Sequence, residues 1–214
     1  MDENIRINGE LIAKIAAITY QCIKDMTDIK VGVSNKHVHL SREHMDILFG
    51  KGSRLTVKKR LGQPGQFAAE EKVTLRGPKG SFENIRVLGP VRSESQVEIS
   101  KSDSYVLGIN APIAESGQLD GTPGIILEGP KGSVELHKGV IIAWRHIHLT
   151  PCEAQLLQVK DKDLVSVEIP GDRGGTMKNV LVRVSDKFAA EMHVDTDEAN
   201  AFGLKNGDKI NISK

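Results

Sequence analysis

A six-residue motif occurs twice in this chain and constrains its fold more than any other feature. Residues 36–41 read Lys-His-Val-His-Leu-Ser, and residues 145–150 read Arg-His-Ile-His-Leu-Thr. The match continues without a gap through the apolar positions that follow each copy. In both copies a Ser or Thr able to cap a short helix precedes a helical turn, a Gly- or Asp-containing turn and a strand-like segment. The repeat therefore indicates two related halves, and residues 198–212 repeat the order of helix, turn and strand a third time.

Most of the chain after residue 28 consists of short β-branched segments separated by Gly, Pro, Asn and Asp. Strands are predicted at 29–33, 72–75, 85–88, 97–100, 124–127, 133–136, 140–143, 164–169, 180–184 and 209–212. The tetrapeptide Gly-Pro-Lys-Gly at 77–80 and again at 129–132 should reverse the chain each time. Many short strands favour barrels or sandwiches over a doubly wound sheet. We therefore predict a mainly β fold with two small β-barrel domains capped by short helices.

An N-terminal segment, residues 10–26, has the spacing of an amphipathic helix instead. Its helically spaced positions are Leu11, Ile12, Ile15, Thr19, Cys22, Ile23 and Met26. Two interpretations stay open. The helix could pack on its own domain or on a second subunit, or it could be a docking peptide for a larger assembly.

Each copy of the repeated motif contains a His-x-His pair: His37 with His39, and His146 with His148. Residues two apart on a strand point to the same side, so both imidazoles of a pair can reach one ion. The apolar residue between them would then face the interior of the barrel. Neutral imidazole suits zinc, and a catalytic zinc site commonly has three protein ligands and one open position. Two such pairs in repeated contexts predict metal binding.

Two further segments could complete these sites. His193 lies in a strand-like segment and could supply a third imidazole to one pair, or it could be a surface histidine. The segment 91–98 places polar side chains at every second position, namely Arg92, Glu94, Gln96 and Glu98. Either carboxylate could complete a site that has two histidines, and Arg92 suits a phosphate or carboxylate. The alternative is an ordinary strand that faces solvent.

Composition and missing motifs exclude several classes of function. The chain has 29 Lys+Arg and 28 Asp+Glu, so no bulk charge favours nucleic acid or an anionic membrane as a partner. Two cysteines are too few for a disulfide framework. No apolar stretch reaches the roughly 18 residues of a membrane span. The N-terminal residues lack the basic start of a secretory signal peptide. An intracellular protein is expected. P-loop, G-x-G-x-x-G and G-x-S-x-G motifs are absent, although Cys152 near His148 keeps a Cys/His nucleophile as an alternative.

Four motifs in order carry a resemblance to a known family. They are Val-Ser-Asn-Lys-His-Val-His-Leu at 33–40, Gly-Pro-Val-Arg at 89–92 with Gln-Val-Glu at 96–98, Arg-His-Ile-His-Leu-Thr-Pro at 145–151, and His-Val-Asp-Thr-Asp-Glu-Ala-Asn-Ala at 193–201. From about residue 28 to its C-terminus the chain resembles the PduL-type phosphotransacylases, also called phosphate propanoyltransferases. That family moves a short acyl group between coenzyme A and phosphate, with two β-barrel domains and a two-metal, usually zinc, site.

The resemblance implies roles for individual residues. The implied metal ligands are His37, His39 and Glu98 for one ion, and His146, His148 and His193 for the other. Glu98 is thereby chosen over Glu94, and Arg92 matches the phosphate-binding arginine of the family. The positions that match coenzyme A contacts are Val33, Ser34, Asn35, Lys79, Arg86 and Asn200, with Lys59 as a weaker match.

The resemblance also implies a domain division and an activity. The expected units are an N-terminal helix at 1–25, one barrel from 26–35 with 144–214, and a second barrel from 36–143. The expected reaction converts propanoyl-CoA or acetyl-CoA plus phosphate reversibly into the acyl phosphate and coenzyme A, by direct transfer at two zinc ions, as in propanediol degradation. A two-metal phosphoester hydrolase and a non-catalytic, metal-stabilised assembly module stay open as alternatives.

Location and partners follow from the same resemblance. Some family members work in the bacterial cytoplasm, and others lie inside bacterial microcompartments and carry an N-terminal encapsulation peptide. Residues 10–26 have that amphipathic character and could contact a shell or cargo protein. A homodimer is expected, and neither nucleic acid nor a membrane is expected as a partner.

Overall fold

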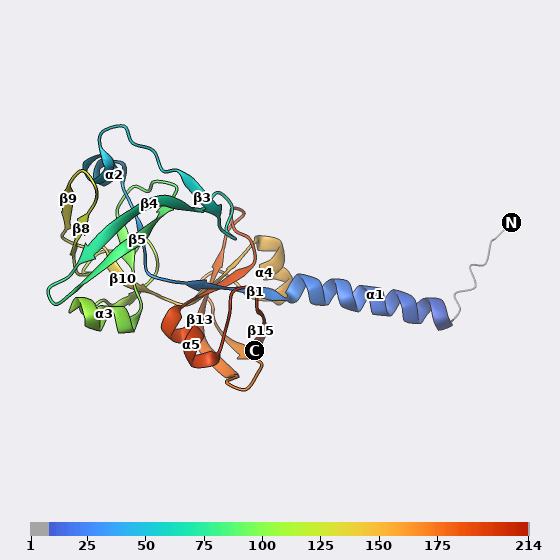
Figure 1. Ribbon diagram of the computed structural model, residues 1–214. Coiled ribbons are helices and arrows are strands. Elements are labelled where there is room, and N and C mark those ends of the chain that lie inside the picture. The colour runs from blue at the N-terminus through green and yellow to red at the C-terminus, as the bar shows by residue number, and fades with distance from the viewer. Residues whose placement is uncertain (1–8, 214) are drawn as a thin grey trace.

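Short strands account for most of the chain (Figure 1), as the spacing of β-branched segments and turn residues predicts. The computed structural model describes residues 9–213, and it describes only the backbone of residues 21–26. The helices are α1 (Gly9–Thr27), α2 (Arg42–Phe49), α3 (Lys101–Leu107), α4 (Pro151–Leu157) and α5 (Thr196–Phe202). The strands are β1 (Ile29–Ser34), β2 (His37–His39), β3 (Val57–Arg60), β4 (Phe67–Arg76), β5 (Ser81–Gly89), β6 (Gln96–Glu98), β7 (Ile113–Ala114), β8 (Ile125–Glu128), β9 (Ser133–Leu136), β10 (Val140–Ala143), β11 (His146–Leu149), β12 (Leu164–Ile169), β13 (Gly175–Val184), β14 (Glu191–Asp195) and β15 (Lys209–Ser213).

One group of strands forms a closed barrel in the order β1-β14-β11-β13-β12-β15, with β15 pairing back on β1. The barrel thus joins the first strand of the chain to the C-terminal third. Its interior is an aliphatic core that includes Ile29, Ile147, Val167 and Met192, each at most 1% exposed. The parallel pairing of β1 with β14 brings residues 30–34 beside 191–195, across most of the sequence.

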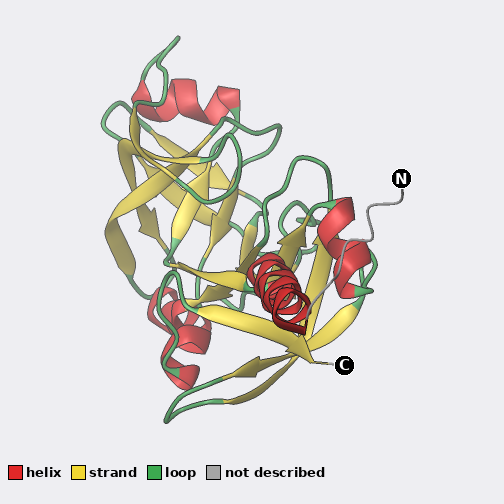
Figure 2. Ribbon diagram, turned by 90° about the vertical axis from the view of Figure 1, so that its right-hand side faces the viewer, coloured by secondary structure: helices red, strands yellow, loops and turns green. Residues whose placement is uncertain are grey.

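The middle of the chain forms a second, curled sheet in the order β7-β10-β6-β2-β5-β4-β8-β9, with β3 paired to β4. It has a separate core that includes Val38, Leu48, Val87 and Leu127. The predicted fold class is confirmed, with one closed barrel, one curled half-barrel sheet and short helices around their outside (Figure 2). We propose that the two cores mark the two domains expected from the sequence, 26–35 with 144–214 and 36–143.

The repeated motif occupies the same topological position in both units. β2 pairs parallel with β5 and antiparallel with β6, whereas β11 pairs parallel with β13 and antiparallel with β14. A capped helix follows each: the Ser41 side chain accepts a hydrogen bond at the start of α2, and the Thr150 side chain does so at the start of α4. The residues between the histidines, Val38 and Ile147, are completely buried, so the predicted alternation of the two faces is confirmed.

The two Gly-Pro-Lys-Gly segments form the turns of hairpins, as predicted. One joins β4 to β5 and the other joins β8 to β9, and in each the first glycine N–H donates to the carbonyl oxygen of the last glycine at 2.9 Å. Glycine is required at the first position of each turn because a Cβ on Gly77 or Gly129 would overlap the backbone of Leu107 or Leu48, respectively.

The prediction of one polar strand face over 91–98 is wrong in part. β6 covers only Gln96–Glu98, and Arg92 makes an isolated bridge with Ser41 instead of continuing the strand. The chain reaches this segment through a cis bond between Gly89 and Pro90. Glu94 is exposed and forms an ion pair with Lys138, whereas Gln96 and Glu98 share one face of β6.

The predicted amphipathic helix is confirmed as α1, which projects away from both strand units (Figure 1). Ile12, Ile15, Ile18 and Tyr20 are each more than half exposed. The side chains of Cys22, Ile23 and Met26, which complete the predicted apolar face, lie outside the described part of the chain, as do residues 1–8 of the predicted N-terminal unit. None of the helices in the described residues is long and apolar enough to cross a membrane.

Replacing Ile147 with Ala should destabilise the chain, because it opens a cavity in the barrel core directly between two predicted metal ligands. We expect a loss of about 3 kcal/mol in the free energy of unfolding, measured by denaturant titration with a chelator present. Ile113→Ala is the matched control because Ile113 is 65% exposed, and it should change stability by less than about 0.5 kcal/mol. Equal losses in the two variants would contradict the assignment of Ile147 to the core.

Candidate active site

The first predicted ligand set comes together on adjacent strands of the curled sheet. His37 and His39 lie on β2. Glu98 lies on the neighbouring strand β6, directly opposite His37. The Nε2 atom of His37 lies 3.4 Å from a Glu98 carboxylate oxygen, and Nε2 of His39 lies 3.8 Å from the other. One potential ligand atom from each residue lies within 4.8 Å of the other two. Two imidazoles and one carboxylate form a donor set that suits zinc.

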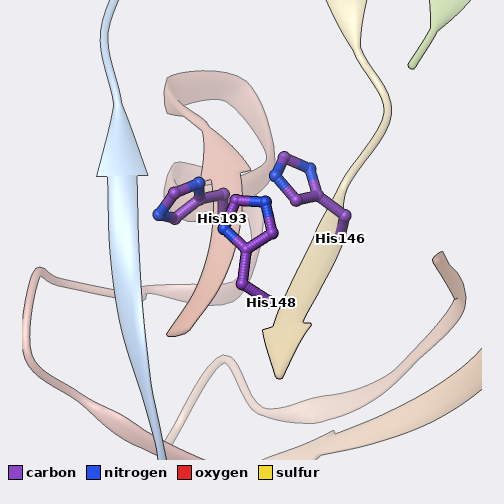
Figure 3. A group of neighbouring side chains, drawn as sticks. All are labelled: His146, His148 and His193. Atoms are coloured by element: carbon purple, nitrogen blue, oxygen red, sulfur yellow. The ribbon is translucent and has the colours of Figure 1, made fainter. Parts of the chain in front are cut away.

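The second predicted ligand set consists of three imidazoles that converge in the barrel (Figure 3). His146 and His148 lie on β11, and His193 lies opposite His146 on β14. The ring centroids are 4.6 to 5.1 Å apart. His193 is partly buried, and its imidazole lies in this cluster, which favours the metal-site interpretation over that of a surface histidine.

Both sets have the hydrogen bonding expected around metal-binding histidines. Nδ1 of His37 lies 2.8 Å from the carbonyl oxygen of Asn35, and Nδ1 of His146 lies 2.7 Å from that of Trp144. A ring N–H donated to a carbonyl fixes the tautomer and leaves Nε2 as the ligand atom. Neither ring nitrogen of His148 finds a hydrogen-bond partner among the described residues, although both are buried. A buried imidazole without partners is unfavourable unless a ligand occupies it, so the second set fits a metal ion.

Charge differs between the two sets. Burial opposes protonation of His37, but the adjacent Glu98 carboxylate outweighs burial and raises the pKa of His37. Burial also works against ionisation of Glu98, yet His37 and the other nearby cationic groups hold its pKa well below the usual value. Burial, with His37 next to it, lowers the pKa of His39 strongly. The first set therefore contains one ionised carboxylate, and its negative charge stabilises a positive charge placed beside it.

The second set contains no carboxylate. Burial, reinforced by the neighbouring histidines, lowers the pKa of His146 to about 4 and that of His148 to about 2. Neutral imidazole is the form that binds metal. These two ligands are consequently ready to bind at neutral pH without first losing a proton.

One cavity of about 600 Å³ connects the two sets. His37, His39 and Glu98 line it from the curled sheet, and His146, His148 and His193 line it from the barrel. The predicted phosphate-binding residue, Arg92, lines the same cavity and donates to the Ser116 hydroxyl at 3.0 Å. A second guanidinium, that of Arg183, lines it from the barrel side. The site thus has two ligand sets and two fixed cations facing a space large enough for small substrates.

Comparison with known proteins identifies the family of the chain. The phosphate propanoyltransferase family model matches residues 30–205. A phosphate propanoyltransferase of Rhodopseudomonas palustris is 54% identical over 206 residues, covering 96% of this chain and 91% of that protein. Those of Thermotoga maritima and Salmonella typhimurium are 56% and 55% identical, over 90% and 83% of this chain and 92% and 85% of their own lengths. The chain belongs to the phosphate propanoyltransferase family. The resemblance carried by its four motifs is confirmed, and the family consists of acyltransferases.

The residues expected to contact coenzyme A fall into two groups. Val33, Ser34 and Lys59 line the large cavity, and Ser34 with Asn35 also lines a smaller one of about 30 Å³ beside it. The other three line neither cavity: Lys79 lies in the β4–β5 turn, Arg86 donates to the carbonyl oxygens of residues 69 and 70, and Asn200 is exposed on α5.

Sequence reasoning missed three polar residues of this phosphate propanoyltransferase site. Arg183 lies opposite His148 on β13, and Glu191 and Gln63 form hydrogen bonds next to His193. Glu191 could have been found, since it precedes His193 by two residues and so shares its strand face. Arg183 interrupts an apolar run, which is a weak signal. Gln63 lies in a connection between strands, and no local pattern marks it.

The depressed pKa values predict acid sensitivity of the metal-free protein. An imidazole with a pKa near 6.5 when unfolded and about 4 when folded stabilises the fold fully only above pH 6.5, and this contribution is lost as pH falls toward 4. For His146 alone the loss at pH 4 is about 3 kcal/mol. Denaturant titrations at several pH values after chelation should show this decline. His146→Gln should have a flatter dependence over the same range, and an unchanged slope would contradict the assignment.

Proposed function

We propose that this chain transfers a short acyl group reversibly between coenzyme A and inorganic phosphate at a site with two divalent metal ions, zinc being the expected metal. The observation that carries this proposal is the joining of two three-residue ligand sets and the Arg92 guanidinium by one cavity. The propanoyl group is inferred from the relatives, which are phosphate propanoyltransferases. Acetyl-CoA is proposed as a second substrate.

The chain's own residues would hold phosphate beside the acyl group. The Arg92 side chain is fixed by the Ser116 hydroxyl, which also accepts a hydrogen bond from the Gln96 amide at 2.8 Å. Its planar guanidinium can bind two phosphate oxygens at once and orient the third toward the thioester carbonyl. When bound to the six ligands, zinc ions would supply positive charge that offsets repulsion between the anionic reactants and polarises an oxygen.

Direct transfer without an acyl-enzyme is the form of the reaction that these residues support. A phosphate oxygen forms a bond to the carbonyl carbon, the bond from that carbon to sulfur breaks, and the coenzyme A thiolate leaves and takes up a proton. The alternative nucleophile, Cys152, is exposed at the start of α4 and lines neither of the two cavities. The geometry therefore gives a Cys/His mechanism no support.

The coenzyme A contacts remain part of the proposal. Val33, Ser34 and Lys59 at the large cavity would hold the portion of the molecule near its thiol. Coenzyme A is long compared with the cavity, so its distant nucleotide portion would reach residues outside it, for which Lys79, Arg86 and Asn200 are proposed.

Assembly and location are proposed on the basis of α1. Its exposed apolar side chains, such as Ile15 and Ile18, favour contact with another chain. A second subunit and a microcompartment shell or cargo protein are the two partners considered. The proposed location is the bacterial cytoplasm or the lumen of a microcompartment.

Coenzyme A release from propanoyl-CoA tests the reaction type. Release should require both phosphate and bound metal, since phosphate is the acyl acceptor, and should stop after chelation and return when zinc is added. A thiol-reactive dye measures the product. Release in phosphate-free buffer would favour a hydrolase, and unfolding on chelation with no activity beforehand would favour a structural role for the metal.

Arg92→Ala should weaken the use of phosphate, because it removes a charged double hydrogen bond to that substrate. We expect kcat/KM for phosphate to fall roughly 10- to 100-fold, with little change in the KM for propanoyl-CoA, and Arg92→Lys should lie between the two. Arg76→Ala is the matched control, since Arg76 forms a surface ion pair with Glu128. Unchanged phosphate kinetics in Arg92→Ala would refute the assigned role.

A further inference from the structure

A carboxylate outside the six ligands contacts the second ligand set. A Glu191 carboxylate oxygen lies 2.9 Å from Nε2 of His193. The same oxygen accepts a hydrogen bond from the side-chain amide of Gln63, also at 2.9 Å. Because the Nε2 proton of His193 is directed to Glu191, Nδ1 of His193 is left as the atom able to bind a metal ion. The His193 ring is thus oriented by a carboxylate that is not itself one of the six proposed ligands.

Gln63 reaches Glu191 from the other unit of the molecule. It lies in the connection between β3 and β4 of the curled sheet, yet its side-chain amide also donates to the carbonyl oxygen of Ala189 in the barrel at 3.0 Å. The amide oxygen of Gln63 accepts from the Ala189 N–H at 3.3 Å. Gln63 is only 3% exposed. A buried amide with all these bonds has one defined orientation, so it links the β3–β4 connection to the barrel beside His193.

The backbone approaches Glu191 and His193 closely at two glycines. A Cβ on Gly62 would overlap the Glu191 carboxylate, and a Cβ on Gly32 of β1 would lie 2.9 Å from Cδ2 of His193. Both glycines have φ values outside the left-handed region, so conformational freedom does not explain their presence. The close approach of the backbone to Glu191 and His193 explains it instead.

The first ligand set has a counterpart in the same position of the repeat. Gln96 lies opposite His39 as Glu191 lies opposite His148, and each precedes the third ligand by two residues. The Gln96 amide donates to the Glu98 carboxylate at 2.6 Å, and its oxygen accepts from the backbone N–H of Gly117 at 2.8 Å. A carboxylate ligand is therefore held by an amide, and an imidazole ligand is held by a carboxylate. In each case the holding group matches the hydrogen-bonding capacity of the ligand.

We propose that Glu191 and Gln63 are positioning residues for the metal site of the barrel: Glu191 selects the ring nitrogen of His193 that binds metal, and Gln63 holds Glu191 from the neighbouring unit. The proposal rests on the two-metal function above. Through Gln63, it also makes the geometry of the barrel site depend on contact with the β3–β4 connection, whose residues 59–63 and Gln66 line the cavity.

Metal affinity and histidine spectra test this proposal on the full, zinc-loaded chain. Zinc transfer to a chromophoric chelator should show that Glu191→Ala binds one of its two ions roughly 10- to 100-fold more weakly, while the ion at His37, His39 and Glu98 is retained. Gln63→Leu, which keeps the side-chain size, should weaken the same ion to a smaller extent. Glu94→Ala removes a carboxylate that pairs only with Lys138 on the surface and should leave both affinities unchanged.

Nitrogen-15 spectra of the histidine rings provide the second measurement. In the wild-type chain, His193 should show a protonated Nε2, and in Glu191→Ala this signature should change while that of His37 stays. If Glu191→Ala does not fold, Glu191→Gln, which keeps an acceptor oxygen, should give intermediate affinity. Wild-type affinity in both Glu191 variants, or equal weakening of both ions, would overturn the proposal. A wild-type chain that binds fewer than two zinc ions would instead contradict the proposed function, and the protonation site of His193 would still decide the role of Glu191.

Discussion

The period-two alternation of two short strands is the constraint on which the rest of this structure depends. In β2 and β11 one residue enters an aliphatic core, and the histidines on either side face the opposite way into the cavity. The completely buried Val38 and Ile147 thereby fix the depth and direction of four imidazoles without any additional element. A slip of one residue would exchange the two faces, so core packing and ligand placement enforce the same register.

The two proposed metal sites would stabilise a buried cation in different ways. In the first, the Glu98 carboxylate is itself a proposed ligand and keeps its charge despite burial, because His37 lies against it. In the second, the three proposed ligands are all imidazoles. Glu191, which is not a proposed ligand, supplies the negative charge beside them, and hydrogen bonds from His193 and Gln63 outweigh burial and lower its pKa. A metal ion whose ligand is hydrogen-bonded to a carboxylate has a different local charge from one that is bound by the carboxylate itself. The two copies of the repeat thus share the geometry of the ligand set and differ in its charge.

Local patterns were sufficient to predict much of the fold and most of the ligands. Alternation, turn residues and the repeated motif identify the strands and both histidine pairs, since these depend on neighbours in sequence. Local patterns could not decide between Glu94 and Glu98, because the strand pattern continues through residues 93–95 in the sequence but β6 begins only at Gln96. They also missed Gln63, whose partner is 128 residues away. Contacts between the two units depend on how the two sheets pack against each other. The periodicity of the sequence within one unit does not predict that packing.

The meeting of the two sheets also explains how a chain with almost no net charge can bind anionic substrates. Arg92 comes from the curled sheet and Arg183 from the barrel, and each lowers the tendency of nearby imidazoles to protonate. Among the described side chains, Arg183 has no carboxylate partner and lies over the Phe188 ring, with its guanidinium carbon 5.7 Å from the ring centre. A guanidinium without an acidic partner in a partly buried cavity is available to an anionic ligand. Positive potential is thus local to the cavity, where two units each contribute an arginine, because the chain as a whole, with 29 basic and 28 acidic residues, has almost no net charge.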